Sequence, residues 1–109
     1  MASSPFPSTE LSVTTIINGT IPASGTSSWT SKQHSIDVSN YKRVVLSCRI
    51  ASAGIGNSLE IDTVAINSQN VSAYWDASNL CNIQISESTL FANAKTKDYP
   101  ISYQLLGLS

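Results

Sequence analysis

Apolar and polar residues alternate most clearly between residues 35 and 51 (SIDVSNYKRVVLSCRIA). From Val44 to Ile50, apolar residues occupy every second position. A period of two in a run rich in β-branched residues is typical of a strand with one buried face. The sequence therefore predicts a central strand here, entered from a turn around Asn40.

Shorter segments show the same alternation along the rest of the chain. Strands are expected over residues 10–18, 29–38, 58–67, 71–75, 80–86 and 101–108. The glycine-rich segment 53–57 is expected to be a loop, because strand rather than helix follows it. Turn signals recur every 8 to 12 residues or so, without strand–helix alternation. The pattern predicts an all-β fold: a single β-sandwich or jelly roll of about eight short antiparallel strands.

Two segments allow alternative predictions. Asn18-Gly19 is a frequent hairpin-turn dipeptide, and residues 20–23 could return as a short strand that Pro22 confines to an edge or an end. Residues 87–98 either contain the one candidate helical turn of the chain or form a strand followed by a loop.

The length of 109 residues indicates one domain. Residues 1–9 carry Pro5 and Pro7 among serines and are expected to form a flexible N-terminal arm. The sandwich domain is expected over residues 10–109. The N-terminus has no basic and apolar signal-peptide pattern, so synthesis in the cytoplasm is expected. No segment approaches the roughly 18 apolar residues that a membrane span needs.

Charged residues make up 12% of the chain and the net charge is −1. This composition argues against nucleic acid or an anionic membrane as a partner. A protein with so little net charge is also not strongly kept apart from its own copies, which fits self-association. Cys48 and Cys81 both fall on predicted inward faces; we expect free buried thiols, with a disulfide as the alternative.

No combination of residues predicts catalysis or a metal site. His34 is the single histidine, and no cysteine or carboxylate stands at local zinc-ligand spacing around it. A Ser–His–Asp triad lacks the sequence context of a nucleophile elbow. We therefore expect a protein that is not an enzyme and that has no catalytic residues, metal or cofactor.

The clustered charges have a simple structural explanation. Glu60 and Asp62 alternate on one strand and are expected on a solvated face rather than in a calcium site. Lys42, Arg43 and Arg49 form a small basic patch on the central strand. Pairing across strands with Glu60 or Asp62 is a better explanation of this patch than nucleic-acid binding.

The aromatic residues suggest two uses. Trp29 with Tyr74-Trp75-Asp76 would suit sugar binding, because exposed rings stack on pyranoses while polar side chains bond their hydroxyls. In the other interpretation, Trp75 belongs to the core and Tyr74 lies at a subunit interface, where aromatic residues are enriched.

The run Ile36-Asp37-Val38-Ser39-x-Tyr41-Lys42-x-Val44 resembles the strand entry of many small jelly-roll domains. These domains include bacteriophage virion proteins, such as head decoration, head fibre and tail components, and carbohydrate-binding modules. The resemblance covers about sixteen residues, which are this run and the strand that it enters, and it carries no functional residue over.

The first hypothesis is therefore a structural or assembly protein of a phage virion, acting through self-association and binding to a particle surface. Its expected partners are its own copies in a homo-oligomer, for example a trimer, and other virion proteins such as the major capsid protein. The candidate interface residues are Phe6, Val64, Ile66, Tyr74 and Tyr103. The alternative is a carbohydrate-binding module or lectin-like domain that binds a glycan through Trp29, Tyr74, Trp75 and Asp76.

Overall fold

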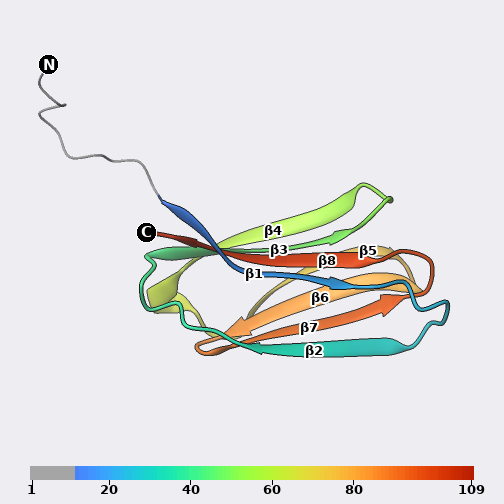
Figure 1. The fold of residues 1–109 in the computed structure, drawn as a ribbon, viewed down its shortest axis with the longest axis horizontal. Coiled ribbons are helices and arrows are strands. Elements are labelled where there is room, and N and C mark those ends of the chain that lie inside the picture. Colours follow the sequence, from blue (N-terminus) through green and yellow to red (C-terminus); the bar gives the residue numbers. More distant parts are fainter. Residues whose placement is uncertain (1–11) are drawn as a thin grey trace, which may run out of the picture.

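The computed structural model describes residues 12–109 and shows the all-β fold that the sequence predicts (Figure 1). Eight strands pair in antiparallel fashion to form two four-stranded sheets packed as a β-sandwich. Their bounds are β1 Val13–Ile21, β2 Trp29–Ser35, β3 Arg43–Ile50, β4 Ile55–Asp62, β5 Gln69–Asp76, β6 Asn79–Ser86, β7 Thr89–Thr96 and β8 Ile101–Leu108.

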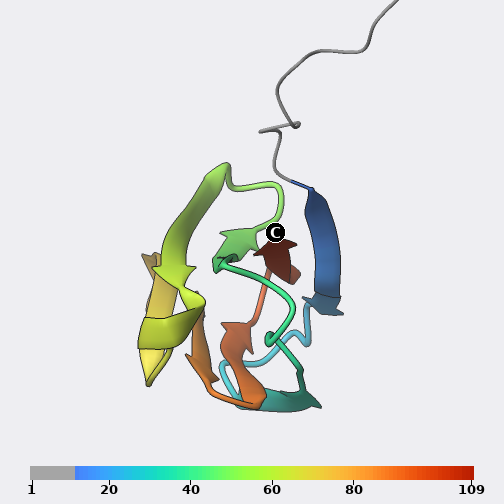
Figure 2. The ribbon, with the colours of Figure 1, turned by 90° about the vertical axis from the view of Figure 1, so that its left-hand side faces the viewer.

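Some strands that are consecutive in the sequence lie in the same sheet, and others lie in different sheets. Sheet A has the order β1-β8-β3-β4, and sheet B has the order β2-β7-β6-β5. The hairpins β3–β4, β5–β6 and β6–β7 stay within one sheet, while the remaining connections cross between sheets. Figure 2 shows the result end-on: the edge strands β1 and β2 lie on one side of the sandwich, and β4 and β5 lie on the other.

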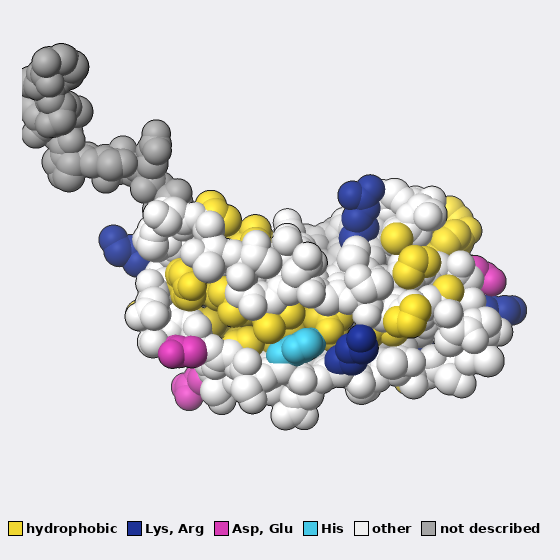
Figure 3. All heavy atoms as spheres, in the orientation of Figure 1, with side chains coloured by type: hydrophobic (Ala, Val, Ile, Leu, Met, Phe, Trp, Pro, Cys, Tyr) yellow, Lys and Arg dark blue, Asp and Glu magenta, His cyan; other side chains and the backbone are white. Residues whose placement is uncertain are grey.

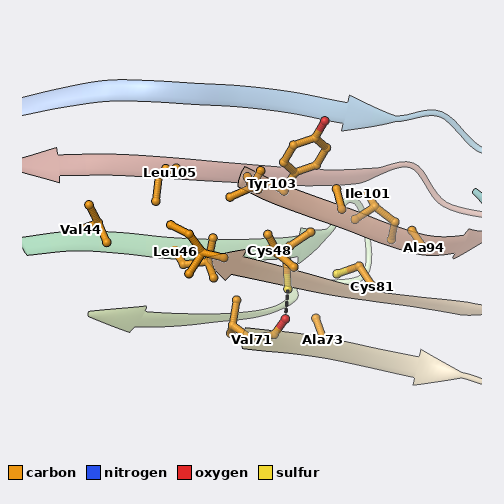
Figure 4. Close-up of a cluster of buried hydrophobic side chains, with 14 of the residues drawn as sticks. Val44, Leu46, Cys48, Val71, Ala73, Cys81, Ala94, Ile101, Tyr103 and Leu105 are labelled. Carbon is orange, nitrogen blue, oxygen red and sulfur yellow. Dashed lines mark hydrogen bonds between the residues drawn. The ribbon is translucent and has the colours of Figure 1, made fainter. Parts of the chain in front are cut away.

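The core lies between the sheets and follows the predicted alternation. Val44, Leu46, Cys48 and Ile50 all point inward from β3, and they meet the inward side chains of β6, such as Cys81, across the core (Figure 4). Both cysteines are buried and unbridged, which confirms the expectation of free thiols. The neighbouring Cys81 thiol, together with burial, raises the pKa of Cys48, so this thiol stays protonated.

The predicted turn at Asn18-Gly19 is wrong, and so is the predicted return strand after it. β1 continues through both residues to Ile21 and pairs with β8, and Gly19 lies opposite Tyr103. Gly19 does not have a positive φ. Its missing side chain makes room for the ring of Tyr103, which a Cβ atom at position 19 would overlap. The glycine thus serves close packing rather than chain reversal.

Three other segments refine the sequence prediction. Residues 87–98 contain the strand β7 and no helical turn. The loop expected over residues 53–57 is shorter, because β4 already begins at Ile55. The strand expected over residues 58–67 ends at Asp62 and gives way to the 3-10 turn Thr63–Ala65.

Within residues 12–109, no helix is long and apolar enough to cross a membrane.

Polar side chains bridge the two open sides of the sandwich. On one side, Lys32 Nζ of β2 donates to the Thr20 carbonyl of β1 at 2.9 Å. On the other side, Asn57 Nδ2 of β4 donates to the Ser72 carbonyl of β5 at 2.6 Å. Figure 3 shows an apolar band along the first side, with the single histidine at its edge. Lys32 is an inward-pointing charge on the edge strand β2, and such a charge also discourages this edge from pairing with strands of other molecules.

The basic patch of the central strand is partly neutralised as predicted. Arg43 forms ion pairs with Glu60 at 3.2 Å and with Asp62 at 3.0 Å. These pairs confirm cross-strand pairing for Arg43. All three side chains are about half exposed, so the pairs contribute little to the free energy of unfolding.

Candidate binding surfaces

The outer side of sheet B carries a continuous surface of uncharged polar and aromatic side chains. We call it the polar–aromatic face. It comprises the outward residues of β2, β5, β6 and β7: Trp29, Ser31, Gln33, Ser35, Asn70, Ser72, Tyr74, Leu80, Asn82, Gln84, Ser86, Thr89, Phe91, Asn93 and Lys95. Lys95 is the one charged residue among them.

One row of this face joins the two aromatic residues at its ends. Trp29 of β2 lies opposite Lys95 of β7, and Lys95 lies opposite Leu80 of β6. Leu80 lies in turn opposite Tyr74 of β5. Trp29 is 54% exposed and Tyr74 is 63% exposed. Neighbouring strands are spaced by about 4.8 Å, so the two aromatic residues stand about 14 Å apart along the row.

The cation at the Trp29 end of the row is held in place. Lys95 Nζ lies 5.3 Å from the centroid of the Trp29 ring, which is a cation–π contact. This contact orients the indole ring on the outer surface of β2. The row therefore offers a positioned ring at one end and a freely exposed ring at the other.

Hydrogen bonds between side chains order the polar row beside it. Ser31 Oγ donates to Asn93 Oδ1 at 2.7 Å, between β2 and β7. Asn82 Nδ2 donates to Ser72 Oγ at 2.7 Å, between β6 and β5. Side chains fixed in this way present their remaining donors and acceptors in one arrangement, which suits recognition of a ligand rich in hydroxyl groups.

The structure brings together two of the four predicted glycan-binding residues. Trp29 and Tyr74 share the polar–aromatic face, whereas Trp75 and Asp76 lie elsewhere. Trp75 packs edge-on against Tyr99, with ring centroids 6.1 Å apart. Asp76 Oδ1 accepts hydrogen bonds from the Ser78 amide at 2.7 Å and from Asn79 Nδ2 at 3.1 Å, so this carboxylate holds a turn together.

A second candidate surface lies at one end of the sandwich, and we call it the end hollow. Its volume is about 470 Å³, and it is formed by the segment after β2, the turn after β4 and the β6–β7 turn. Its apolar lining residues are Ile36, Val38, Val64 and Ile66. Val64 is 98% exposed, while the other three are buried. A fully exposed valine beside an apolar hollow is suited to contact with another molecule.

An ionised carboxylate stands at the rim of the end hollow. Asp37 accepts hydrogen bonds from the Ser39 hydroxyl at 2.6 Å and from the Ser39 amide at 3.0 Å. These bonds hold the pKa of Asp37 below its ordinary value. The end hollow therefore combines an apolar lining with negative charge at its rim.

The predicted interface residues have different environments. Val64 and Ile66 both line the end hollow, and Tyr74 is exposed on the polar–aromatic face. Tyr103 is 2% exposed and packs inside the sandwich, so its assignment to a subunit interface is corrected. Phe6 lies outside the described residues, as does the arm expected over residues 1–9.

The single histidine has a structural environment. His34 Nε2 lies 2.6 Å from the Tyr103 hydroxyl, and the two rings are tilted against each other. Burial raises the pKa of Tyr103, so its hydroxyl stays protonated and can donate to the imidazole. In the part of the chain that the structure describes, no three His, Cys, Asp or Glu side chains gather as a metal site would require.

The sequence could not show that Leu80 and Lys95 complete the aromatic row. Their outward positions follow from strand alternation, but their alignment with Trp29 and Tyr74 follows from the register of three strand pairs. Comparison with known proteins adds no relative: no family model, no curated protein and no solved structure matches the chain.

Proposed function

We propose that this chain is a non-enzymatic structural and assembly protein, most concretely a small component of a bacteriophage virion. In this role it associates with its own copies and binds a particle surface, as a capsid decoration, fibre or tail protein. The observation that supports self-association is the end hollow, where Val64 is 98% exposed beside three buried apolar residues.

A second copy of this chain is the occupant that we propose for the end hollow. Burying a valine side chain contributes about 1.5–3 kcal/mol, and the apolar lining provides a place to bury it. The net charge of −1 gives two copies little long-range repulsion to overcome. In a symmetric oligomer this contact would repeat at every subunit, so its contribution would multiply.

The virion assignment rests on the resemblance of residues 36–44 to small virion jelly-roll domains, and the sandwich fold is compatible with it. In that setting, the major capsid protein or a neighbouring virion protein would be the second partner. The mechanism is passive binding. Catalysis has no part in it, and His34 has a structural partner in Tyr103.

Val64→Asp is expected to convert the oligomer to monomers. An aspartate carboxylate cannot enter an apolar contact without losing its hydration, and Asp37 already stands at the rim of the hollow. The measurement is light scattering coupled to size-exclusion chromatography at several concentrations. Val13→Asp is the matched control, because Val13 is also exposed, at 61%, but belongs to β1 and not to the end hollow.

A monomeric wild-type chain at all concentrations would contradict self-association. An oligomer that persists in Val64→Asp would contradict the end hollow as its interface. Loss of the oligomer in both variants would also count against this specific contact, because it would show a general effect of added charge.

Glycan binding is the second candidate function, and the aromatic row of the polar–aromatic face favours it. Trp29 and Tyr74 stand about 14 Å apart, which suits an oligosaccharide rather than a single sugar ring. The amide and hydroxyl side chains of the neighbouring row lie beside them. This arrangement combines stacking surfaces with hydrogen-bonding groups and almost no charge, which suits a neutral oligosaccharide.

Trp29→Ala is expected to weaken glycan binding about tenfold or more, which corresponds to about 1.4 kcal/mol. The measurement is a glycan array followed by titration calorimetry with any oligosaccharide that binds. Trp75→Ala is the matched control, because it also removes an indole ring but one that packs against Tyr99 away from this face. An array without binding, or equal losses in the two folded variants, would contradict this function.

A further inference from the structure

A second hollow lies on the outer side of sheet A, on the opposite side of the molecule from the polar–aromatic face. We call it the Arg49 hollow. Its volume is about 390 Å³, and it extends over β1, β8, β3 and the start of β4. Its outward polar side chains are Asn18, Ser47, Arg49, Ser102 and Gln104.

Strand register brings these side chains together. Asn18 of β1 lies opposite Gln104 of β8, which lies opposite Ser47 of β3. In the next outward row, Ser102 of β8 lies opposite Arg49 of β3. The five side chains thus occupy two adjacent rows of one sheet face, within reach of a single small ligand.

Gly56 of β4 keeps the space beside Arg49 open. It pairs with Arg49 in the register of β3 and β4. A Cβ atom at position 56 would stand 3.3 Å from both Cβ and Cγ of Arg49 and 3.0 Å from the Cys48 carbonyl oxygen. Any larger residue would crowd the base of the arginine side chain.

Arg49 differs from the other arginine on the same face of the same strand. Arg43 forms ion pairs with Glu60 and Asp62. Within residues 12–109, Arg49 forms neither an ion pair nor a side-chain hydrogen bond. Its four polar neighbours likewise form no side-chain hydrogen bonds within these residues; they are Asn18, Ser47, Ser102 and Gln104. On the polar–aromatic face, by contrast, such side chains bond one another.

We propose that the Arg49 hollow binds a carboxylate-bearing sugar, such as a uronic acid unit of an acidic polysaccharide. A guanidinium group binds a carboxylate through two parallel hydrogen bonds. One cation matches one carboxylate charge, whereas a phosphate dianion usually needs more cations or several backbone amides. The amides and hydroxyls around Arg49 supply partners for the sugar hydroxyls. This site is independent of both functions proposed above.

The test follows backbone amide signals of the full-length chain by NMR during titration with a galacturonic acid trimer. Signals of residues 47–49 and 102–104 are expected to shift, with an affinity that falls as salt increases. Arg49→Gln is expected to weaken this binding at least tenfold. Arg43→Gln is the matched control and is expected to bind as the wild type does.

Two further ligands define what the site recognises. Neutral galactose trimer and inorganic phosphate are expected to shift the same signals at least tenfold more weakly. Equal binding of the neutral trimer would overturn the role of the carboxylate, and equal binding of phosphate would overturn the sugar assignment. The proposal is also overturned if the galacturonic acid trimer shifts no signals, or shifts those of the polar–aromatic face instead.

Discussion

Replacing Asn79 with aspartate is expected to lower the free energy of unfolding by about 4 kcal/mol at neutral pH. Asn79 is fully buried at the start of β6. Its Nδ2 donates to Asp76 Oδ1 and to Asp98 Oδ2, each at 3.1 Å. Its Oδ1 accepts from the amides of Asp98 at 2.8 Å and Tyr99 at 3.3 Å. In the variant, a carboxylate oxygen would take the place of Nδ2 and would face the carboxylate oxygens of Asp76 and Asp98.

The loss in Asn79→Asp is expected to depend on pH. Burial and two neighbouring carboxylates raise the pKa of the introduced carboxyl in the folded state above its value in the unfolded chain. The folded variant therefore binds more protons than the unfolded variant, so the destabilisation shrinks as pH falls through that raised pKa. Urea unfolding at neutral and mildly acidic pH measures both effects.

Asn82→Asp is the matched control, because Asn82 belongs to the same strand but points outward. Its amide donates to Ser72 and Asn70 on an exposed surface. We expect a change within about 1 kcal/mol there. Equal losses at positions 79 and 82 would show that the buried amide does not hold the β5–β6 turn to the β7–β8 loop.

The sequence predicts a strand best where alternation runs through large side chains. β3 and β6 follow the period of two, so their inward faces could be predicted residue by residue. β7 was ambiguous because its inward positions include Ala92 and Ala94, which fit a helix as well as a strand. Both alanines are fully buried in the core, and the pairing of β7 with β2 and β6 places them there.

The candidate surfaces could be predicted less completely than the fold. Trp29 and Tyr74 stand out in the sequence as aromatic residues in predicted strands, but 44 residues separate them along the chain. Only the order β2-β7-β6-β5 and its register place them on one row. The assignment of Tyr103 to an interface is wrong because its ring is buried in the space that Gly19 leaves, and no local sequence signal links these two residues.

Gly19→Ala is expected to lower the free energy of unfolding by about 3 kcal/mol, the upper end of the usual cost of overpacking. The added methyl group would overlap the ring of Tyr103, which is buried between β1 and the core (Figure 4). The ring cannot move freely, because its hydroxyl is bonded to His34 at 2.6 Å. Urea unfolding of the variant measures the cost.

A double-mutant cycle separates this overlap from the general effect of losing a glycine. Tyr103→Leu removes the ring, so Gly19→Ala should cost less than about 1 kcal/mol in the Tyr103→Leu background, with the difference appearing as coupling energy. Gly25→Ala serves as the control, because position 25 has open space and only a positive φ of 75°. We expect about 1 kcal/mol there. Equal costs in the two backgrounds would mean that Gly19 is needed for the backbone of β1 and not for the ring of Tyr103.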